Sequence, residues 1–421
     1  AGPAAAAVGR LALSLGKMAT RRWGMAVVAV VAVVVAACSG GEVEDAPPVP
    51  EVPTEDEVEV GELSTDVASV PEPPPPGEPG DLVALAPRAG PDVPPGAQAW
   101  DVLYLSEGVK GAPVVVSGVV FAPEGPTPDE PRPVVSWAHG SVGVADVCAP
   151  SRTGVQVPDL VQMLDAGYVV AATDYEGLGT PGTHPYLVGR SEGRSVLDAA
   201  RAAGRIEGAG AGQEVVVLGH SQGGQSVLFA GQLAPDYAPE LALVGVVASA
   251  PAAELSTLLR SAAPISLGYG LVSSGIYAYS QAYDELVLAD VLTPVAIERI
   301  GVVEEVCLNE LTTMFARESP PSLLVANPLD VPAWAERVEQ NEPGSAAIAA
   351  PVLVVQGGND FIVFPSSTDT AVERLCQGGN VVDYRRYPGV NHGEILGEAG
   401  PEILTWVADR FAGRDATSTC G

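Results

Sequence analysis

A serine lies between two glycines in the run Gly219-His220-Ser221-Gln222-Gly223. An apolar run over 215–218 precedes it, and a helix-like run over 225–232 follows it. This order predicts a buried strand that turns sharply into a helix and presents the serine hydroxyl at the bend. Glycines are expected there because a Cβ atom would collide with a neighbouring strand or helix. Ser221 is therefore the candidate nucleophile; the alternative interpretation is a glycine-rich loop after a strand.

A serine hydroxyl needs a general base near neutral pH, and the sequence contains only 4 histidines. His220 is adjacent to the serine, where its side chain must point away from it. His139 ends a strand-like run and His184 lies in a proline-flanked loop. His392 follows the last strand-like run and precedes the last helix-like run, where the chain order nucleophile, acid, base puts the base. We predict that His392 is the base.

The acid that orients the base is expected after the strand-like run over 352–356. Asp360 lies in the turn that follows this run. Asp369 and Asp383 are the alternatives, but the first lies in a helix-like run and the second within the last strand. Ser221, Asp360 and His392, in this order and at strand ends, predict nucleophilic acyl transfer.

Acyl transfer also needs donors for the tetrahedral oxyanion. A second strand-like run ends in Trp137-Ala138-His139-Gly140-Ser141. A backbone N–H after such a strand acts together with the N–H of the residue after the nucleophile. We assign the two donors to Ser141 and Gln222, with any of residues 140–143 open as the first, and a plain strand-to-loop turn as the alternative interpretation.

Other chemistries have little support in the sequence. It contains no His-Glu-x-x-His, no Cys-x-x-Cys and no close histidine pair, so no metal is predicted. It also contains no G-x-x-x-x-G-K-[ST] loop, and no cofactor is predicted. A formal net charge of −31 argues against nucleic acid as a partner.

Strand-like and helix-like runs alternate from about Asp81 onward, which predicts an α/β fold. We expect a mostly parallel central sheet with helices on both faces over residues 81–421. Strands are expected at 100–106, 114–122, 133–140, 168–173, 215–219, 243–249, 352–356 and 381–387.

An insertion over about 254–345 interrupts this alternation and contains several tyrosines and many aliphatic residues in helix-like runs. Insertions on the catalytic face of such sheets commonly exclude water and shape the substrate pocket. We interpret this insertion as a helical cap, and a purely structural helical subdomain is the alternative.

Residues 1–38 resemble a bacterial lipoprotein signal peptide, with Lys17, Arg21 and Arg22 before an apolar stretch. The stretch ends in Val35-Ala36-Ala37-Cys38, which resembles a lipobox with Cys38 as the acylated residue. Residues 39–80 are acidic, proline-rich and without basic residues, and so predict a disordered tether. The expected location is the bacterial cell envelope, with a lipid anchor in the membrane. An ordinary secretion signal, and a secreted protein, are the alternative.

Four further cysteines, an even number in an exported protein, suggest two disulfides with three possible connectivities. We favour Cys148 with Cys307 and Cys376 with Cys420. Free buried thiols are the alternative.

The chain from about Asp101 to the last helix resembles the secretory lipase family, the lipase A type within the α/β-hydrolase superfamily. The resemblance rests on the runs Cys148–Ser151, Gly167–Gly177, Ser191–Asp198, Gly219–Gly224 and Asn341–Gly344, and on Asp360 and Asn391–Gly393. It implies hydrolysis of carboxylic esters including acylglycerols, with Ser221, Asp360 and His392 as the triad. It also implies an inserted cap and a disulfide from Cys148 to a cap cysteine. The lipobox, the tether and the strand that ends in Trp137-Ala138-His139-Gly140 depart from the family pattern.

The predicted function is therefore hydrolysis of esters or lipids by an acyl-enzyme mechanism, as a lipase. A short-chain carboxylesterase is the first alternative. A peptidase on the same scaffold would need an acidic pair for a substrate amine, for which Glu176 and Glu192 are the candidates. An acyltransferase would differ only in its acceptor, and a non-catalytic adhesion module would not need all three triad residues.

Overall fold

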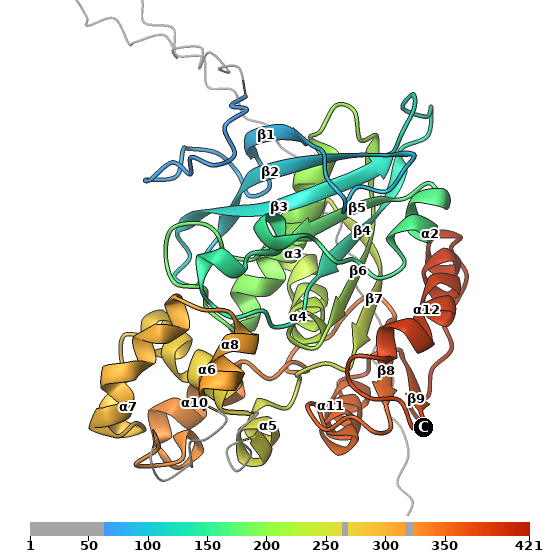
Figure 1. The fold of residues 1–421 in the computed structure, drawn as a ribbon. Coiled ribbons are helices and arrows are strands. Elements are labelled where there is room, and N and C mark those ends of the chain that lie inside the picture. Colours follow the sequence, from blue (N-terminus) through green and yellow to red (C-terminus); the bar gives the residue numbers. More distant parts are fainter. Residues whose placement is uncertain (1–62, 263–267, 316–322) are drawn as a thin grey trace, which may run out of the picture. The chain divides into compact units, whose positions relative to one another are not determined.

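A nine-stranded sheet is the centre of the computed structural model, which describes residues 63–262, 268–315 and 323–421 (Figure 1). The strands are β1 (Leu82–Arg88), β2 (Ala97–Glu107), β3 (Pro113–Pro123), β4 (Arg132–Ala138), β5 (Val169–Thr173), β6 (Ala211–His220), β7 (Ala242–Ser249), β8 (Val352–Gly357) and β9 (Val382–Tyr387). Their order across the sheet is β1-β2-β3-β5-β4-β6-β7-β8-β9. The predicted strands are all present; β1 was not predicted.

The sheet is antiparallel at one edge and parallel over the rest. The β1–β2, β2–β3 and β3–β5 pairs are antiparallel. All pairs from β5–β4 through β8–β9 are parallel. The carboxyl ends of β4, β6, β7, β8 and β9 therefore meet at one edge, which is where ligands bind in open α/β sheets.

The central strands are apolar on both faces, which is why they read as continuous hydrophobic runs. In β6, Val215 and Val217 face one core cluster, whereas Val216 and Leu218 face the other. The first cluster includes side chains of α3, α4 and α11, and the second includes side chains of α2 and α12. Helices thus cover both faces, as predicted for an α/β-hydrolase fold.

The helices around the sheet are α1 (Pro150–Thr153), α2 (Leu160–Asp165), α3 (Gly189–Gly204), α4 (Gln222–Tyr237), α11 (Pro365–Gln377) and α12 (Ile395–Phe411), with the short 3-10 helix η1 (Asp146–Cys148). The helix α4 begins directly after β6. This strand-to-helix step positions Ser221.

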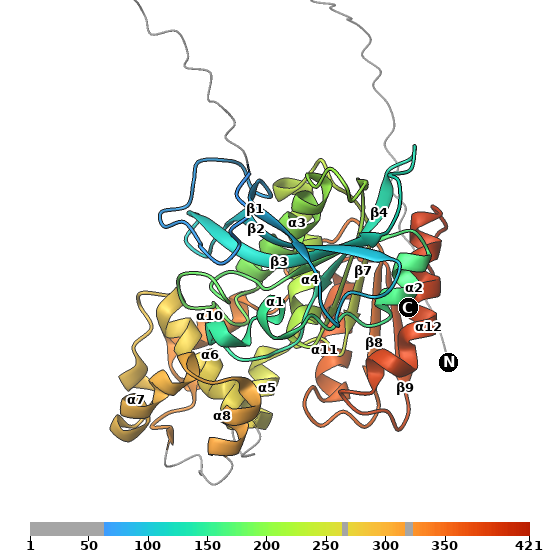
Figure 2. The ribbon, with the colours of Figure 1, turned by 45° about the horizontal axis from the view of Figure 1, so that its top comes forward.

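A group of helices lies between β7 and β8 in the sequence and forms the predicted cap. Its elements are α5 (Leu255–Ala262), α6 (Gly268–Ala282), α7 (Pro294–Arg299), α8 (Leu308–Phe315), α10 (Pro332–Gln340), and the 3-10 helices η2 (Leu288–Asp290), η3 (Ile300–Glu304) and η4 (Pro328–Asp330). They share a separate hydrophobic cluster that includes Tyr269, Ile276 and Trp334. In both ribbon views they gather at one end of the sheet (Figures 1 and 2).

Both ends of the cap are attached to the same helix of the body. Arg374 on α11 pairs with Glu254, just before α5, and its Nη2 lies 3.5 Å from Oε2 of Glu342, just after α10. Arg374 also donates to the carbonyl oxygen of Pro343 at 2.9 Å. The cap therefore leaves and rejoins the body at one anchored point.

Residues 64–80 differ from the sequence-based expectation of a tether that extends to residue 80. Ser64 forms an isolated bridge with Ala84, and Val67 and Val70 pack against Leu103 and Leu105. Apolar side chains between the acidic residues cover the outer face of the antiparallel edge, so the packed chain begins before Asp81. Residues 1–62, with Cys38 and most of the predicted tether, lie outside the described residues.

Within the described ranges, none of the helices is long and apolar enough to cross a membrane.

Candidate active site

Ser221 occupies the bend between β6 and α4. Its φ of 60° and ψ of −115° are a strained combination for a residue with a side chain. The bend is held by its neighbours, because the Ser221 N–H donates to Ser249 at 2.9 Å and its carbonyl accepts from Ala252 at 2.9 Å. These hydrogen bonds therefore hold the Ser221 hydroxyl at the carboxyl ends of the strands.

The two glycines of the bend are required by close backbone contacts. A Cβ atom at Gly219 would lie 2.1 Å from the carbonyl oxygen of Gly223, in the first turn of α4. A Cβ atom at Gly223 would lie 1.9 Å from the carbonyl oxygen of Ala138, at the end of β4. Both glycines are thus required for the steric reason expected from the sequence: a Cβ atom would collide with the neighbouring backbone.

Ser221, His392 and Asp360 meet at the carboxyl edge of the sheet. His392 Nε2 lies 3.0 Å from Ser221 Oγ, and His392 Nδ1 lies 2.6 Å from Asp360 Oδ2. With the proton on Nδ1, Nε2 is free to accept the serine proton. This is the geometry that a serine nucleophile, its base and an orienting carboxylate need. Asp369 and Asp383 bind elsewhere, to Tyr384 and Arg385.

Asp360 is held by donors on every side. It is 1% exposed. Its Oδ1 accepts the N–H groups of Ile362 at 2.8 Å and Val363 at 2.9 Å, and its Oδ2 accepts from Gln356 Nε2 at 3.1 Å. Backbone and amide donors thus fix the carboxylate toward His392.

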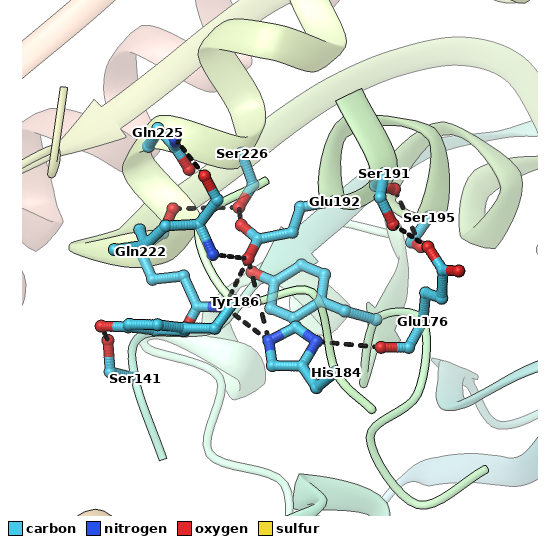
Figure 3. A network of polar contacts seen from close by, with 12 residues as sticks. Ser141, Glu176, His184, Tyr186, Ser191, Glu192, Ser195, Gln222, Gln225 and Ser226 are labelled. Atoms are coloured by element: carbon cyan, nitrogen blue, oxygen red, sulfur yellow. Dashed lines mark hydrogen bonds and ion pairs between the residues drawn. The ribbon is translucent and has the colours of Figure 1, made fainter. Parts of the chain in front are cut away.

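Ser141 and Gln222 are the predicted oxyanion donors. Ser141 lines the same cavity as Ser221, and Gln222 is the first residue of α4. The N–H groups in the first turn of a helix have no partner within the helix. Ser141 Oγ lies 2.6 Å from the hydroxyl of Tyr186, which fixes the orientation of the loop after β4 (Figure 3).

The side chain of Gln222 points into a buried polar network (Figure 3). Its Nε2 lies 2.7 Å from Glu192 Oε1 and 3.0 Å from His184 Nε2. Burial lowers the pKa of His184 to about 3, so this imidazole is neutral and accepts from the amide. Burial raises the pKa of Glu192 to about 7, against the lowering effect of its hydrogen bonds.

A cavity of about 290 Å³ opens from Ser221 and His392 under the cap. Its wall on the cap side is almost entirely aliphatic or aromatic; it includes Leu255, Leu258, Leu271, Val272, Ile276, Tyr279, Trp334 and Val338. Such a wall suits an apolar chain attached to the reacting carbonyl.

Two disulfides are present, with the favoured connectivity. Cys148 is bonded to Cys307, and Cys376 is bonded to Cys420. The first joins the loop that carries Ser141 to the start of α8. A hydrogen bond of 2.9 Å from Leu308 N–H to the Val142 carbonyl strengthens the same connection.

Within the described part of the chain, no group of three His, Cys, Asp or Glu side chains is arranged to hold a metal ion.

The family of this chain follows from a comparison with known protein families, in which residues 147–419 match the secretory lipases. The match spans most of the chain and includes Ser221, Asp360 and His392. The chain belongs to the secretory lipase family.

The relatives of this secretory lipase come from bacteria and fungi. It is 27% identical to a probable inactive lipase of Mycobacterium tuberculosis over 347 residues, which cover 77% of this chain and 76% of that protein. It is 26% identical to lipase A of Arthroderma benhamiae over 355 residues, which cover 77% and 73% of the two chains. Its fold is similar to that of Candida antarctica lipase A in its closed state, with a TM-score of 0.72 and 19% identity over 81% of this chain and 84% of that chain.

Sequence reasoning missed the residues that support the candidate catalytic groups of this lipase. Gln356 and the backbone of Ile362 and Val363 hold Asp360, and Tyr186 holds the Ser141 loop. Glu192 was considered only as a ligand for a substrate amine. The sequence did contain a sign of the role of Gln356, a polar residue near the end of the otherwise apolar strand β8. A buried polar residue close to a predicted acid suggests that it supports that acid.

Proposed function

We propose that this secretory lipase hydrolyses carboxylic esters that have an apolar acyl chain, through a covalent intermediate on Ser221. The observation that carries the proposal is the alignment of Ser221 Oγ, His392 and Asp360 at 3.0 Å and 2.6 Å beside an apolar cavity. Acylglycerols are the proposed natural class of substrate.

In the first half of the reaction, Ser221 Oγ attacks the ester carbonyl carbon while His392 Nε2 takes the hydroxyl proton. Asp360 accepts a hydrogen bond from the Nδ1–H group of His392 and so stabilises the imidazolium as it forms. The backbone N–H groups of Ser141 and Gln222 are the proposed donors to the oxyanion. His392 then gives its proton to the leaving alcohol, and the acyl group remains on Ser221.

In the second half, a water molecule takes the place of the alcohol. His392 accepts a proton from this water as it attacks the acyl carbonyl, and then returns the proton to Ser221 Oγ as the carboxylic acid leaves. The same donors act on the second oxyanion.

The cap supports the assignment to acyl chains and gives little support to a peptidase. The acidic pair considered for a substrate amine is Glu176 and Glu192. Neither of them is among the described residues that line the cavity at Ser221. Glu192 is 0% exposed, and its Oε1 accepts two protein N–H donors. We therefore propose the segment of about 254–345 as a lid over the acyl site.

The test is hydrolysis of p-nitrophenyl esters from acetate to palmitate, and of an emulsified triglyceride, by the purified protein. We expect turnover of medium and long chains and its loss, by at least about a thousandfold, in Ser221→Ala. One relative is described as a probable inactive lipase, so the first result needed is whether the wild-type protein hydrolyses any ester.

Ser249→Ala is the matched control, because it also truncates a buried serine at the end of a central strand, outside the triad. It should retain turnover. Cleavage of acetate and butyrate esters alone would favour the short-chain carboxylesterase. No turnover of any ester by the folded protein would overturn the hydrolase.

We also propose export of the chain and acylation of Cys38, after removal of the preceding residues. Support comes from the basic and apolar segments before Val35-Ala36-Ala37-Cys38 and from the two disulfides, which persist in oxidising compartments. Labelling of expressing cells with a palmitate analogue should mark the protein, and Cys38→Ser should remove the label and release the protein from membranes. Unlabelled wild-type protein in the medium would favour ordinary secretion.

A further inference from the structure

Glu192 is a buried carboxyl group that the proposed reaction does not use, yet it contacts the residue after the nucleophile (Figure 3). Its Oε1 accepts from Leu187 N–H at 2.8 Å and from Gln222 Nε2 at 2.7 Å. Its Oε2 lies 2.5 Å from Ser226 Oγ. Glu192 therefore ties α3 to the first turn of α4, the turn that carries the proposed oxyanion donor.

The partners of Glu192 are compatible with a protonated carboxyl group. Ser226 Oγ also lies 2.9 Å from the carbonyl oxygen of Gln222. A hydroxyl has one hydrogen, so Ser226 donates either to Glu192 Oε2 or to the Gln222 carbonyl oxygen. Both contacts are hydrogen bonds at the same time only when Glu192 is protonated and donates to Ser226. In the protonated state the carboxyl O–H donates to Ser226, Ser226 donates to Gln222, and Oε1 accepts both N–H groups. Every polar atom is then satisfied without a buried charge.

Among the described residues, no charged side chain pairs with an ionised Glu192. His184 Nε2 lies 3.8 Å from Glu192 Oε1, but this imidazole carries no charge. His184 donates through Nδ1 to the Glu176 carbonyl at 2.9 Å and accepts at Nε2 from Gln222, so it is held neutral. On the same helix, Arg190 is exposed and Arg194 pairs with Glu107 at 2.7 Å.

The remaining ionisable groups around Glu192 add no positive charge. Burial raises the pKa of each surrounding tyrosine and keeps it neutral; the tyrosines are Tyr175 and Tyr186 from the segment before α3 and Tyr279 from α6. Glu176 is acidic and engaged with Val109 N–H and Ser191. The polar side chains of α4 in this group of contacts are Gln222, Gln225 and Ser226, which are uncharged.

We propose that Glu192 is a positioning residue of the oxyanion hole, and that it acts in its uncharged form by fixing Gln222 and Ser226 without placing a negative charge beside the developing oxyanion. The inference rests on the proposed function, because the oxyanion arises only if Ser221 attacks an ester. Loss of the Glu192 proton is then expected to lower turnover, because like charges repel strongly in a buried environment.

The pH dependence of turnover tests this role. We would measure kcat and KM for tributyrin by titration of the released acid, from pH 5 to pH 10. For the wild type we expect a fall of about tenfold on the alkaline side as Glu192 ionises. Glu192→Gln can donate to Ser226 and accept both N–H groups but cannot ionise. It should retain kcat at pH 7 within about threefold and lose the alkaline limb.

Two further variants separate positioning from general stability. Glu176→Gln alters a second, half-buried glutamate near the network, without a hydrogen bond to Gln222, and should keep the wild-type profile. Glu192→Ala removes the contact with Gln222 and should lower kcat about tenfold or more with KM nearly unchanged, an effect that Glu192→Gln restores. A wild-type profile without an alkaline limb, or an alkaline limb that persists in folded Glu192→Gln, would overturn the proposal.

A measurement that does not depend on activity distinguishes the two proposals. Infrared difference spectra of the wild type and Glu192→Gln should contain the band of a protonated carboxylic acid at pH 6, absent in the variant. If this band is absent, the proposal that Glu192 is uncharged is wrong, even if esters are hydrolysed. With the band but no hydrolysis by the wild type, the proposed function fails, and with it the role of Glu192 in the oxyanion hole.

Discussion

The ring of His220 supports the backbone of His392: its Nε2 lies 3.0 Å from the His392 carbonyl oxygen, and the two ring centres are 4.6 Å apart. Only an Nε2–H tautomer can donate to this carbonyl. Burial, and to a smaller extent His392, lower the pKa of His220 to about 4, so the ring is neutral at working pH. The residue before the nucleophile therefore holds the loop of the proposed base.

His220→Phe should lower kcat by about tenfold, because loss of this hydrogen bond costs on the order of 1 kcal/mol of positioning energy. KM should change little, since the cavity keeps its apolar wall. His220→Gln, which can still donate, is the matched control in steady-state ester hydrolysis and should recover part of the rate. Equal kcat in all three proteins would show that the contact does not position His392.

Gly223→Ala should prevent folding or destabilise the protein by more than about 3 kcal/mol, since its methyl group would overlap the Ala138 carbonyl. Gly397→Ala in α12 is the control, because a Cβ atom there meets nothing within 4 Å. It should be neutral or stabilise by up to about 1 kcal/mol. Urea denaturation measures both. A folded Gly223→Ala protein of normal stability would contradict the tight elbow.

The two disulfides should contribute differently to activity. Their sequence separations are 159 and 44 residues, which in the chain-entropy model correspond to about 5 and about 4 kcal/mol. We expect the double serine variant at Cys148 and Cys307 to lose both stability and long-chain turnover, because it frees the Ser141 loop from α8. The double variant at Cys376 and Cys420 should lose stability only. Thermal unfolding and p-nitrophenyl palmitate hydrolysis would separate the two; equal losses of kcat would refute the distinction.

Glu192→Gln should stabilise the fold more at pH 8 than at pH 4. The pKa of Glu192 is raised from 4.5 to about 7 by burial, so the folded state retains a proton that the unfolded state releases. The stabilising effect of this proton is complete below pH 4.5 and is lost as the pH rises through about 7. The shift corresponds to about 3 kcal/mol. Urea denaturation at both pH values, with Glu176→Gln as the comparison, measures it; a pH-independent difference would be the contrary result.

Gly275→Leu should shorten the accepted acyl chain. Gly275 lines the cavity on α6, and a Cβ atom there meets nothing within 4 Å, so a larger side chain enters open space. We expect kcat/KM for palmitate esters to fall by about tenfold or more while acetate hydrolysis remains within about threefold. A uniform change across chain lengths would indicate that acyl groups do not lie along α6.

The strands and the order of the proposed triad could be read from the sequence. Runs such as Val215–Leu218 are apolar without a break, which indicates burial on both faces. Ser221 and Asp360 follow such runs within a few residues, and His392 follows the strand-like run over 381–387. The Cys148–Cys307 and Cys376–Cys420 bonds were favoured from the positions of the cysteines, although their connectivity needed the fold. Most of these features depend on residues that are close together in the chain, so they can be recognised in the sequence.

Tertiary structure decided what depends on contacts between distant segments. β1 was not predicted. The packing of Val67 and Val70 was also missed, because apolar side chains scattered among acidic residues have no clear period. Glu192 and Gln222 are 30 positions apart, and His220 and His392 are 172 apart. The pKa shifts of Glu192, His184 and His220 follow from burial, which the order of residues does not contain. The sequence alone determined which groups could react, and the packing of α3, α4 and the His392 loop decided their partners and their charges.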